Sequence, residues 1–213
     1  MTGEDHILED RPKCGGMRRE GGVFVAIVGP SGAGKDTLIR RARDQFREDG
    51  RIHFVRRVIT RDVDLASEDH ATMTPEAFEA AEKKGAFALS WAAHGLHYGL
   101  PAEIDKRIAE GQVVVANVSR RVLPDIEARY PHALVVEVTA SVDVLAERLS
   151  QRGRETREAI AARLARNVPV ALEACEVVKI DNSGPVENAA GMLVRLLTDR
   201  LNWREAAASL RKD

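Results

Sequence analysis

Residues 29–35 read GPSGAGK, a spacing of glycines and one lysine that can bind phosphate groups. Glycine tolerates backbone turns that a Cβ would block, so successive N–H groups in such a loop can point inward at an anion. Lys35 adds a mobile positive charge, and residues 36–45 can begin a helix whose N-terminal dipole has the same sign. The apolar run Val23–Val28 comes directly before the loop. This strand, loop and helix predict a site for the β- and γ-phosphates of a nucleoside triphosphate, made of Gly29, Pro30, Ser31, Gly32, Ala33, Gly34, Lys35, Asp36 and Thr37.

The residue after the lysine departs from the usual pattern, in which a Ser or Thr hydroxyl ligates Mg²⁺. Here that residue is Asp36, and Thr37 follows it. A carboxylate is a hard oxygen ligand that can hold Mg²⁺ directly or through water, although it also sets negative charge near the triphosphate. We expect Asp36 or Thr37 to face the metal.

The composition excludes several classes of protein. The chain has 213 residues, enough for one well-buried α/β core with a small lid but short for two ordinary domains. Its 32 Lys and Arg against 33 Asp and Glu leave a net charge of -1, so no overall field recruits nucleic acid or an anionic membrane. No apolar stretch approaches the roughly 20 residues of a membrane span. Cys14 and Cys175 fit neither a metal-ligand spacing nor a disulfide framework, which favours a reducing, cytoplasmic location.

The elements alternate as a parallel sheet requires. β-Branched runs at 113–118, 133–138 and 177–180 alternate with helical patterns at 120–130, 142–152, 155–172 and 186–201. This order predicts a doubly wound α/β fold, with helices on both faces of a parallel sheet and the nucleotide at the end of the first strand. We expect an extension at 1–22, one nucleotide-binding domain at 23–201 with an acceptor-binding insertion at about 53–100 and a lid at about 148–168, and a tail at 202–213.

A cluster of arginines falls in the predicted lid. Arg148 and Arg152 are four residues apart on one helical face, and Gly153 can end that helix. Guanidinium groups that reach over a transferring phosphoryl group would neutralise its charge. The same spacing also suits a solvated helix face. Arg163, on the next predicted helix, is a further candidate for the lid.

Several short segments together resemble one group of enzymes. These are GPSGAGKDTL at 29–38, ITRD at 59–62, SEDH at 67–70, LSW at 89–91, GLHYG at 95–99, RGRE at 152–155 and ARLAR at 162–166. The chain resembles the ribose 1,5-bisphosphate phosphokinases of phosphonate breakdown, which belong to the guanylate-kinase-like group of P-loop kinases. The resemblance covers roughly residues 23–184 and implies a P-loop NTPase fold of the guanylate-kinase-like type.

The resemblance also implies an activity and a set of site residues. The expected reaction is transfer of a phosphoryl group from ATP, with Mg²⁺, to α-D-ribose 1,5-bisphosphate. Arg61 in the TR element and Tyr98 in the HYG element would contact the acceptor phosphate. Lys35, Arg148 and Arg152 would be catalytic, and His97 and Arg163 would also bind the acceptor. The expected partner is this small phosphorylated sugar, with no nucleic acid and no membrane, and a homodimer is left open.

Departures from guanylate kinases bear on the acceptor. The loop after Arg61 is acidic and lacks the residues that would read a guanine base. The segment VVVANVSRR at 113–121 has Asn117 and Ser119 at its end, where guanylate kinases have acidic residues. Either the metal-side carboxylate has moved to Asp36, or Asn117 and Ser119 cap the next helix. A guanylate kinase remains the alternative enzyme, and a non-catalytic binding module would be expected to lack the intact loop.

Other residues near the expected acceptor region have two interpretations. His70, His94 and His97 could contact sugar hydroxyls or phosphate, but such histidines are more often polar loop residues. Trp91 could stack on a ligand, although core packing is its more common use.

Overall fold

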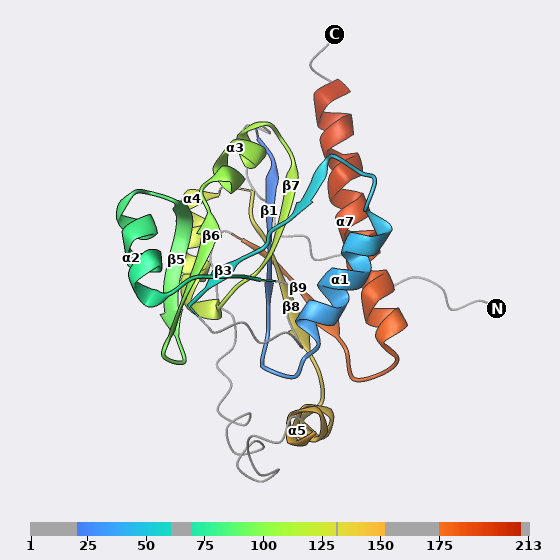
Figure 1. Ribbon diagram of the computed structural model, residues 1–213. Helices are drawn as coiled ribbons and strands as arrows, with labels where there is room; N and C mark the ends of the chain where they lie inside the picture. The colour runs from blue at the N-terminus through green and yellow to red at the C-terminus, as the bar shows by residue number, and fades with distance from the viewer. Residues whose placement is uncertain (1–20, 61–69, 131, 152–174, 210–213) are drawn as a thin grey trace, which may run out of the picture.

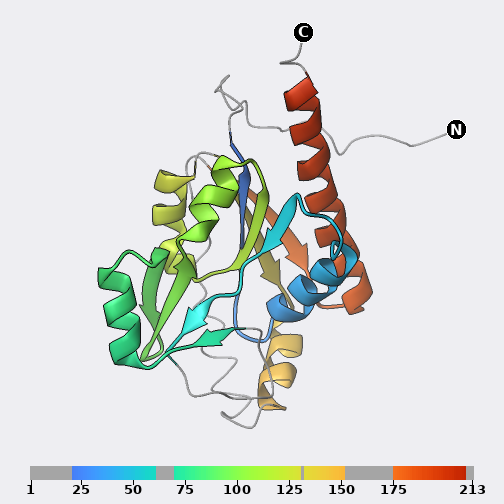
Figure 2. The same cartoon turned by 45° about the horizontal axis from the view of Figure 1, so that its top comes forward.

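Two β-sheets, one of five strands and one of four, form the framework (Figures 1 and 2). The computed structural model describes residues 21–60, 70–130, 132–151 and 175–209. The larger sheet is parallel throughout, in the order β2-β7-β1-β8-β9. Its strands are β2 (Ile52–Phe54), β7 (Val113–Asn117), β1 (Val23–Val28), β8 (Leu134–Thr139) and β9 (Glu176–Asp181).

The smaller sheet has the order β4-β3-β6-β5 and lies to the left of the larger one in Figure 1. Its strands are β4 (Ala71–Thr72), β3 (Val58–Ile59), β6 (Leu96–Pro101) and β5 (Phe87–Ala93). A tight turn at His94 and Gly95, both with positive φ, joins β5 to β6 as an antiparallel hairpin. Helix α2 (Pro75–Lys83) packs against β5 of this sheet.

Helices cover both faces of the parallel sheet. One face carries α1 (Lys35–Gln45) and α7 (Val186–Ser209), and the other carries α3 (Glu103–Ala109), the 3₁₀ turn η1 (Arg120–Val122) and α4 (Leu123–Arg129). Helix α5 (Val142–Ser150) follows β8 at the nucleotide end. The described part of the chain has no helix that is both long and apolar enough to span a bilayer.

The alternation of side chains along β1 produces two cores. Val25 and Ile27 point toward α1 and α7, where Leu38 and Leu193 are fully buried. Their neighbours in β1, which point to the opposite face, pack with α3 and α4. Because β1 is buried on both faces, its sequence VFVAIV is apolar at every position, as a central parallel strand requires.

The fold class predicted from the sequence is confirmed, with differences at particular boundaries. At the start of the predicted insertion, β2 and β3 are separated by three residues that cross from one sheet to the other. Helix α7 continues to Ser209, past the start of the predicted tail at 202. The residues there include Ala, Glu and Arg, which favour helix, and contain no Gly or Pro to stop it. The predicted helix at 155–172, and most of the predicted lid, lie outside the described residues.

A polar cluster ties α3 to the end of α4. Tyr130 Oη donates a hydrogen bond of 2.7 Å to Asp105 Oδ1, and Arg129 Nε donates one of 3.2 Å to the same oxygen. The Tyr130 ring stacks on Phe24 of β1, with 4.8 Å between ring centroids. The hydrogen bond from Arg129, assisted by the one from Tyr130, holds the pKa of Asp105 below its ordinary value although partial burial opposes this shift.

We expect Asp105→Asn to lower the free energy of unfolding near neutral pH by about 1 kcal/mol, because a charge-assisted hydrogen bond in a partly exposed cluster is lost. A carboxylate whose pKa is lowered by folding stabilises the protein above its unfolded pKa of about 3.9, and loses that effect as the pH falls through the folded pKa. Chemical denaturation over this range should therefore show the wild type and the variant converging as the pH falls below about 4. A stability difference that stays constant with pH would contradict the role of the Asp105 charge.

Candidate active site

The phosphate-binding loop leaves the C-terminal end of β1 in a path that only glycines can follow. Gly29, Gly32 and Gly34 have φ values of 142°, 86° and 89°, in the region that side chains disfavour. A Cβ on Gly29 would lie 2.1 Å from the carbonyl oxygen of Val138 in β8. A Cβ on Gly34 would lie 2.5 Å from Asn182 Nδ2. The glycine spacing therefore serves both the turn of the loop and its close packing on the ends of β8 and β9.

Two polar side chains, those of Asn182 and Arg148, donate hydrogen bonds to carbonyl oxygens of the loop. Asn182, which is 3% exposed, donates from Nδ2 to the carbonyl oxygen of Ala33 at 2.8 Å. Arg148 of α5 donates to the carbonyl oxygens of Gly32 and Asn182, at 3.4 and 3.0 Å. Arg148 thus lies against the loop backbone, and it is not among the described residues that line the pocket in front of the loop. Its expected contact with the transferring group stays a prediction.

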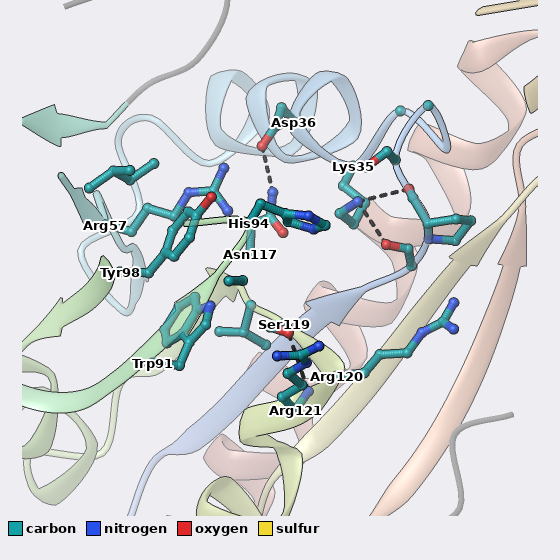
Figure 3. A pocket seen from close by; sticks show the side chains of 18 of the residues that line it. Lys35, Asp36, Arg57, Trp91, His94, Tyr98, Asn117, Ser119, Arg120 and Arg121 are labelled. Carbon is teal, nitrogen blue, oxygen red and sulfur yellow. Dashed lines mark hydrogen bonds between the residues drawn. The ribbon is translucent and has the colours of Figure 1, made fainter. Parts of the chain in front are cut away.

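Lys35 stands at the first position of α1. Its Nζ donates to the carbonyl oxygens of Gly29 and Pro30, at 2.9 and 3.0 Å (Figure 3). These bonds keep the ammonium group at the mouth of the loop, next to the N-terminal end of the helix. Both the lysine charge and the helix dipole are therefore directed at the place where a phosphate would bind.

Asp36 is held by a residue from the neighbouring strand. Asn117 Nδ2 donates a hydrogen bond of 2.7 Å to Asp36 Oδ1 (Figure 3). In the described part of the chain no hydrogen bond is donated to the other carboxylate oxygen, Oδ2. Ser119 has the other role that the sequence left open, since its Oγ accepts from the backbone N–H of Arg121 and caps η1. Thus Asn117 holds the Asp36 carboxylate by a hydrogen bond, whereas Ser119 caps the 3₁₀ turn η1.

A cavity of about 490 Å³ opens in front of the loop, between the parallel sheet and the smaller sheet (Figure 3). Its lining combines the loop, the β5–β6 hairpin, the segment between β2 and β3, and the residues that follow β7. The described residues that line it are Gly29, Pro30, Ser31, Gly32, Gly34, Lys35, Asp36, Thr37, Arg57, Ile59, Trp91, Ala93, His94, Tyr98, Asn117, Val118, Ser119, Arg120 and Arg121.

Strand alternation divides the predicted acceptor residues on β6. Tyr98 lines the cavity and stacks on Trp91, with ring centroids 5.4 Å apart and 5° between the ring planes. His97, the next residue, faces away from the cavity, and its ring lies 5.6 Å from that of Phe78 on α2. The structure therefore brings Tyr98 to the site and leaves His97 outside it. His94, at the hairpin turn, lines the cavity instead.

Three other predicted residues, Arg61, Arg152 and Arg163, lie outside the described part of the chain. The sequence interpretation missed Arg57, Arg120 and Arg121, which all line the cavity. A signal was present, because the pairs Arg56-Arg57 and Arg120-Arg121 follow strands of the parallel sheet, whose C-terminal ends meet at one edge.

Arg120 has a structural partner. Its Nη2 lies 3.4 Å from Glu137 Oε1, and the Glu137 side chain is only 6% exposed. A carboxylate buried at this depth requires a cation beside it, so the Arg120 charge balances Glu137.

No protein-family model matches the chain. Among individual proteins, the ribose 1,5-bisphosphate phosphokinase PhnN of Brucella melitensis is 55% identical over 165 residues, which cover 78% of this chain and 86% of that protein. The protein of the same name from Rhizobium etli is 46% identical over 197 residues, covering 92% of this chain and 96% of that protein.

Among solved structures, the guanylate kinase from Anaplasma phagocytophilum superposes with a TM-score of 0.61 at 17% identity, covering 86% of this chain and 88% of that one. At this identity the likeness establishes the fold alone, which agrees with the guanylate-kinase-like architecture expected from the sequence. The two sequence comparisons extend over most of both partners at far higher identity. The chain therefore belongs to the ribose 1,5-bisphosphate phosphokinase family.

Proposed function

We propose that the protein transfers the γ-phosphoryl group of ATP to α-D-ribose 1,5-bisphosphate, giving 5-phospho-α-D-ribose 1-diphosphate and ADP. The observation that carries this proposal is the 55% identity to a protein of that named activity. The geometry supports it in two respects. The phosphate-binding loop is complete, and the cavity in front of it has a basic lining of a size suited to a phosphorylated sugar.

On the nucleotide side, the loop residues Gly32 and Gly34, with Lys35, would bind the β- and γ-phosphates. Backbone N–H groups of the loop and the N-terminal end of α1 supply fixed dipoles, and the lysine supplies the mobile charge. Lys35 would exchange its present bonds to the loop carbonyls for bonds to phosphate oxygens.

On the acceptor side, an oxygen of the 1-phosphate would attack the γ-phosphorus while the bond from that phosphorus to the β,γ-bridging oxygen breaks and ADP leaves. No general base is needed, because the attacking phosphate oxygen is already anionic. The protein's contribution is position and charge neutralisation. Tyr98 and Arg121 are the described candidates to hold the attacking phosphate, and Arg61, Arg148, Arg152 and Arg163 keep the roles expected from the family resemblance.

The acid–amide pair at the loop fits a magnesium ion. Asp36 uses one carboxylate oxygen for Asn117, so the other is available as a hard oxygen ligand, and Thr37 lines the same cavity. Asp36 and Thr37 would hold the ion, whose chemistry there would be to neutralise negative charge on the nucleotide phosphates. Asn117 would orient the Asp36 carboxylate. The negative charge that faces the metal would then come from Asp36, next to the loop lysine. Asn117, at the end of β7 where an acidic residue is more usual, would contribute a neutral amide.

The direct test is ADP release with ATP and Mg²⁺, offering ribose 1,5-bisphosphate and GMP as acceptors in separate reactions. We expect turnover with the sugar bisphosphate and not with GMP, because the described cavity lining has a single acid, Asp36, already bonded to Asn117, and no glutamate that could read a base. Turnover with GMP alone would contradict the proposal and make the protein a guanylate kinase.

Lys35→Ala should lower kcat by about 10²- to 10³-fold, because one charged group directed at the transferring phosphate is lost. Lys106→Ala is a matched control, since Lys106 is 79% exposed on α3 and pairs only weakly with Glu110 at 3.7 Å. Steady-state kinetics and thermal unfolding of both variants separate loss of catalysis from loss of fold. Near-normal turnover by Lys35→Ala would exclude the assigned role of the loop.

Asp36→Asn should raise the Mg²⁺ concentration for half-maximal activity by about tenfold or more, since the carboxylate is replaced by a neutral amide of the same shape. The double variant Asp36→Asn, Asn117→Asp returns a carboxylate to the same pair, so we expect it to recover part of the Mg²⁺ affinity. Calorimetric titration of Mg²⁺ in the presence of ADP measures this affinity independently of turnover. A normal Mg²⁺ requirement in Asp36→Asn would remove Asp36 from the metal site.

A further inference from the structure

Three strands of the smaller sheet set a row of side chains along one wall of the cavity. Tyr98 of β6 pairs in register with Ile59 of β3 on one side and with Trp91 of β5 on the other. Residues in register on neighbouring strands point to the same face of a sheet, and all three of these residues line the cavity. The row is uncharged, whereas Lys35 stands at the nucleotide loop. This wall therefore offers the ligand aromatic and aliphatic surface.

The two aromatic rings of this row present their edges to the cavity. The rings of Trp91 and Tyr98 stack with centroids 5.4 Å apart and 5° between their planes, so each covers one face of the other (Figure 3). Arg57 lies over the Tyr98 ring, and the indole of Trp91 also packs against the core that includes Val122 of η1. Because side chains stand roughly perpendicular to a sheet, rings stacked across two strands turn their edges away from it. A planar base gains little from such a wall, since stacking needs an open ring face.

Each of the two rings carries one polar group at its edge. Among the residues that the structure describes, none forms a hydrogen bond with the indole N–H of Trp91 or with the hydroxyl group of Tyr98, and neither polar atom is buried. The edge of an aromatic ring is also its electropositive part. The indole N–H is a donor only, so its partner must be an atom with a lone pair. These properties fit a ligand that is rich in oxygen.

Trp91 is the uncharged neighbour of Tyr98 along this wall. With Tyr98 on the attacking phosphate, the sugar ring of the acceptor begins one oxygen atom away from that phosphorus. We propose that Trp91 binds this sugar, its indole N–H donating a hydrogen bond to a ribose oxygen. A neutral donor suits a neutral sugar oxygen, whereas a charged donor favours a phosphate. This inference rests on the proposed function for the identity of the acceptor, and it makes Trp91 a residue that selects a sugar phosphate over a nucleotide.

Trp91→Phe keeps an aromatic ring in the stack and removes the N–H, so it tests the donor separately from the packing. We expect kcat/KM for ribose 1,5-bisphosphate to fall by about 3- to 10-fold, the usual effect of losing one neutral hydrogen bond, and mainly through KM. The KM for ATP should stay unchanged, because the indole does not belong to the nucleotide loop. Thermal unfolding checks that the variant is folded. An unchanged KM for the bisphosphate, or an equal rise in both KM values, would overturn the proposal.

Trp203→Phe is the matched control, because it makes the same chemical change on α7. Trp203 is 37% exposed there, and its ring lies 6.3 Å from that of His132 between centroids. It is not among the described residues that line the cavity, so both KM values should stay normal. If this control raises the KM for the bisphosphate as much as Trp91→Phe does, the assignment of the sugar contact to Trp91 is wrong.

A fluorescence measurement separates this inference from the proposed function. The sequence has two tryptophans, so the Trp203→Phe variant emits from Trp91 alone, and ribose 1,5-bisphosphate added without ATP reports binding without turnover. We expect the emission to change with the bisphosphate and not with inorganic pyrophosphate, which has phosphates but no sugar. If it does so while the ADP-release assay shows no turnover, the function is wrong and the sugar contact stands. If ADP is released but the emission responds to neither ligand, or to both equally, the sugar contact is wrong.

Discussion

The parallel pairing of β1 with β7 is the constraint on which the site depends. Its register sets Ile27 opposite Asn117, and the next backbone bond runs from Val118 N–H to the Ile27 carbonyl oxygen at 3.0 Å. Parallel strands end at the same edge, so this register delivers the phosphate-binding loop and the Asn117 amide to one place. The 2.7 Å bond between Asn117 and Asp36 then joins strand β7 to helix α1 across the nucleotide site. A slip of one residue would turn Asn117 to the other face of the sheet and break this bond.

The shape of the loop depends on the other neighbour of β1. The carbonyl oxygen of Val138 in β8 and the Asn182 side chain after β9 approach so closely that Gly29 and Gly34 leave no room for a Cβ. Asn182 and Arg148 also satisfy loop carbonyl oxygens that would otherwise lie against the sheet edge. The loop is therefore pre-organised before any nucleotide arrives, which reduces the ordering that phosphate binding has to impose.

The cavity in front of the loop is built by a different principle, from two sheets that do not share hydrogen bonds. The parallel sheet supplies the reacting edge, and the smaller sheet supplies the aromatic wall of Trp91 and Tyr98 with Arg57 beside it. The segment between β2 and β3 crosses from one sheet to the other, and its residue Arg57 lines both this cavity and a smaller pocket beside Asp36 and Thr37.

The sequence by itself determined the loop, the buried strand before it and the alternation of strands with helices, because each of these depends on residues that are adjacent in the chain. Through a family resemblance it also predicted that Tyr98 contacts the acceptor phosphate; Tyr98 lines the cavity, and that contact stays a prediction. It missed Arg57 and Arg121 and placed His97 in the site, since the face to which a short strand turns is set by its pairing partner. Only the tertiary structure decided that Asn117 meets Asp36 and that Arg57 covers Tyr98. These contacts join residues far apart in sequence, and they follow from strand order and register, which no local pattern specifies.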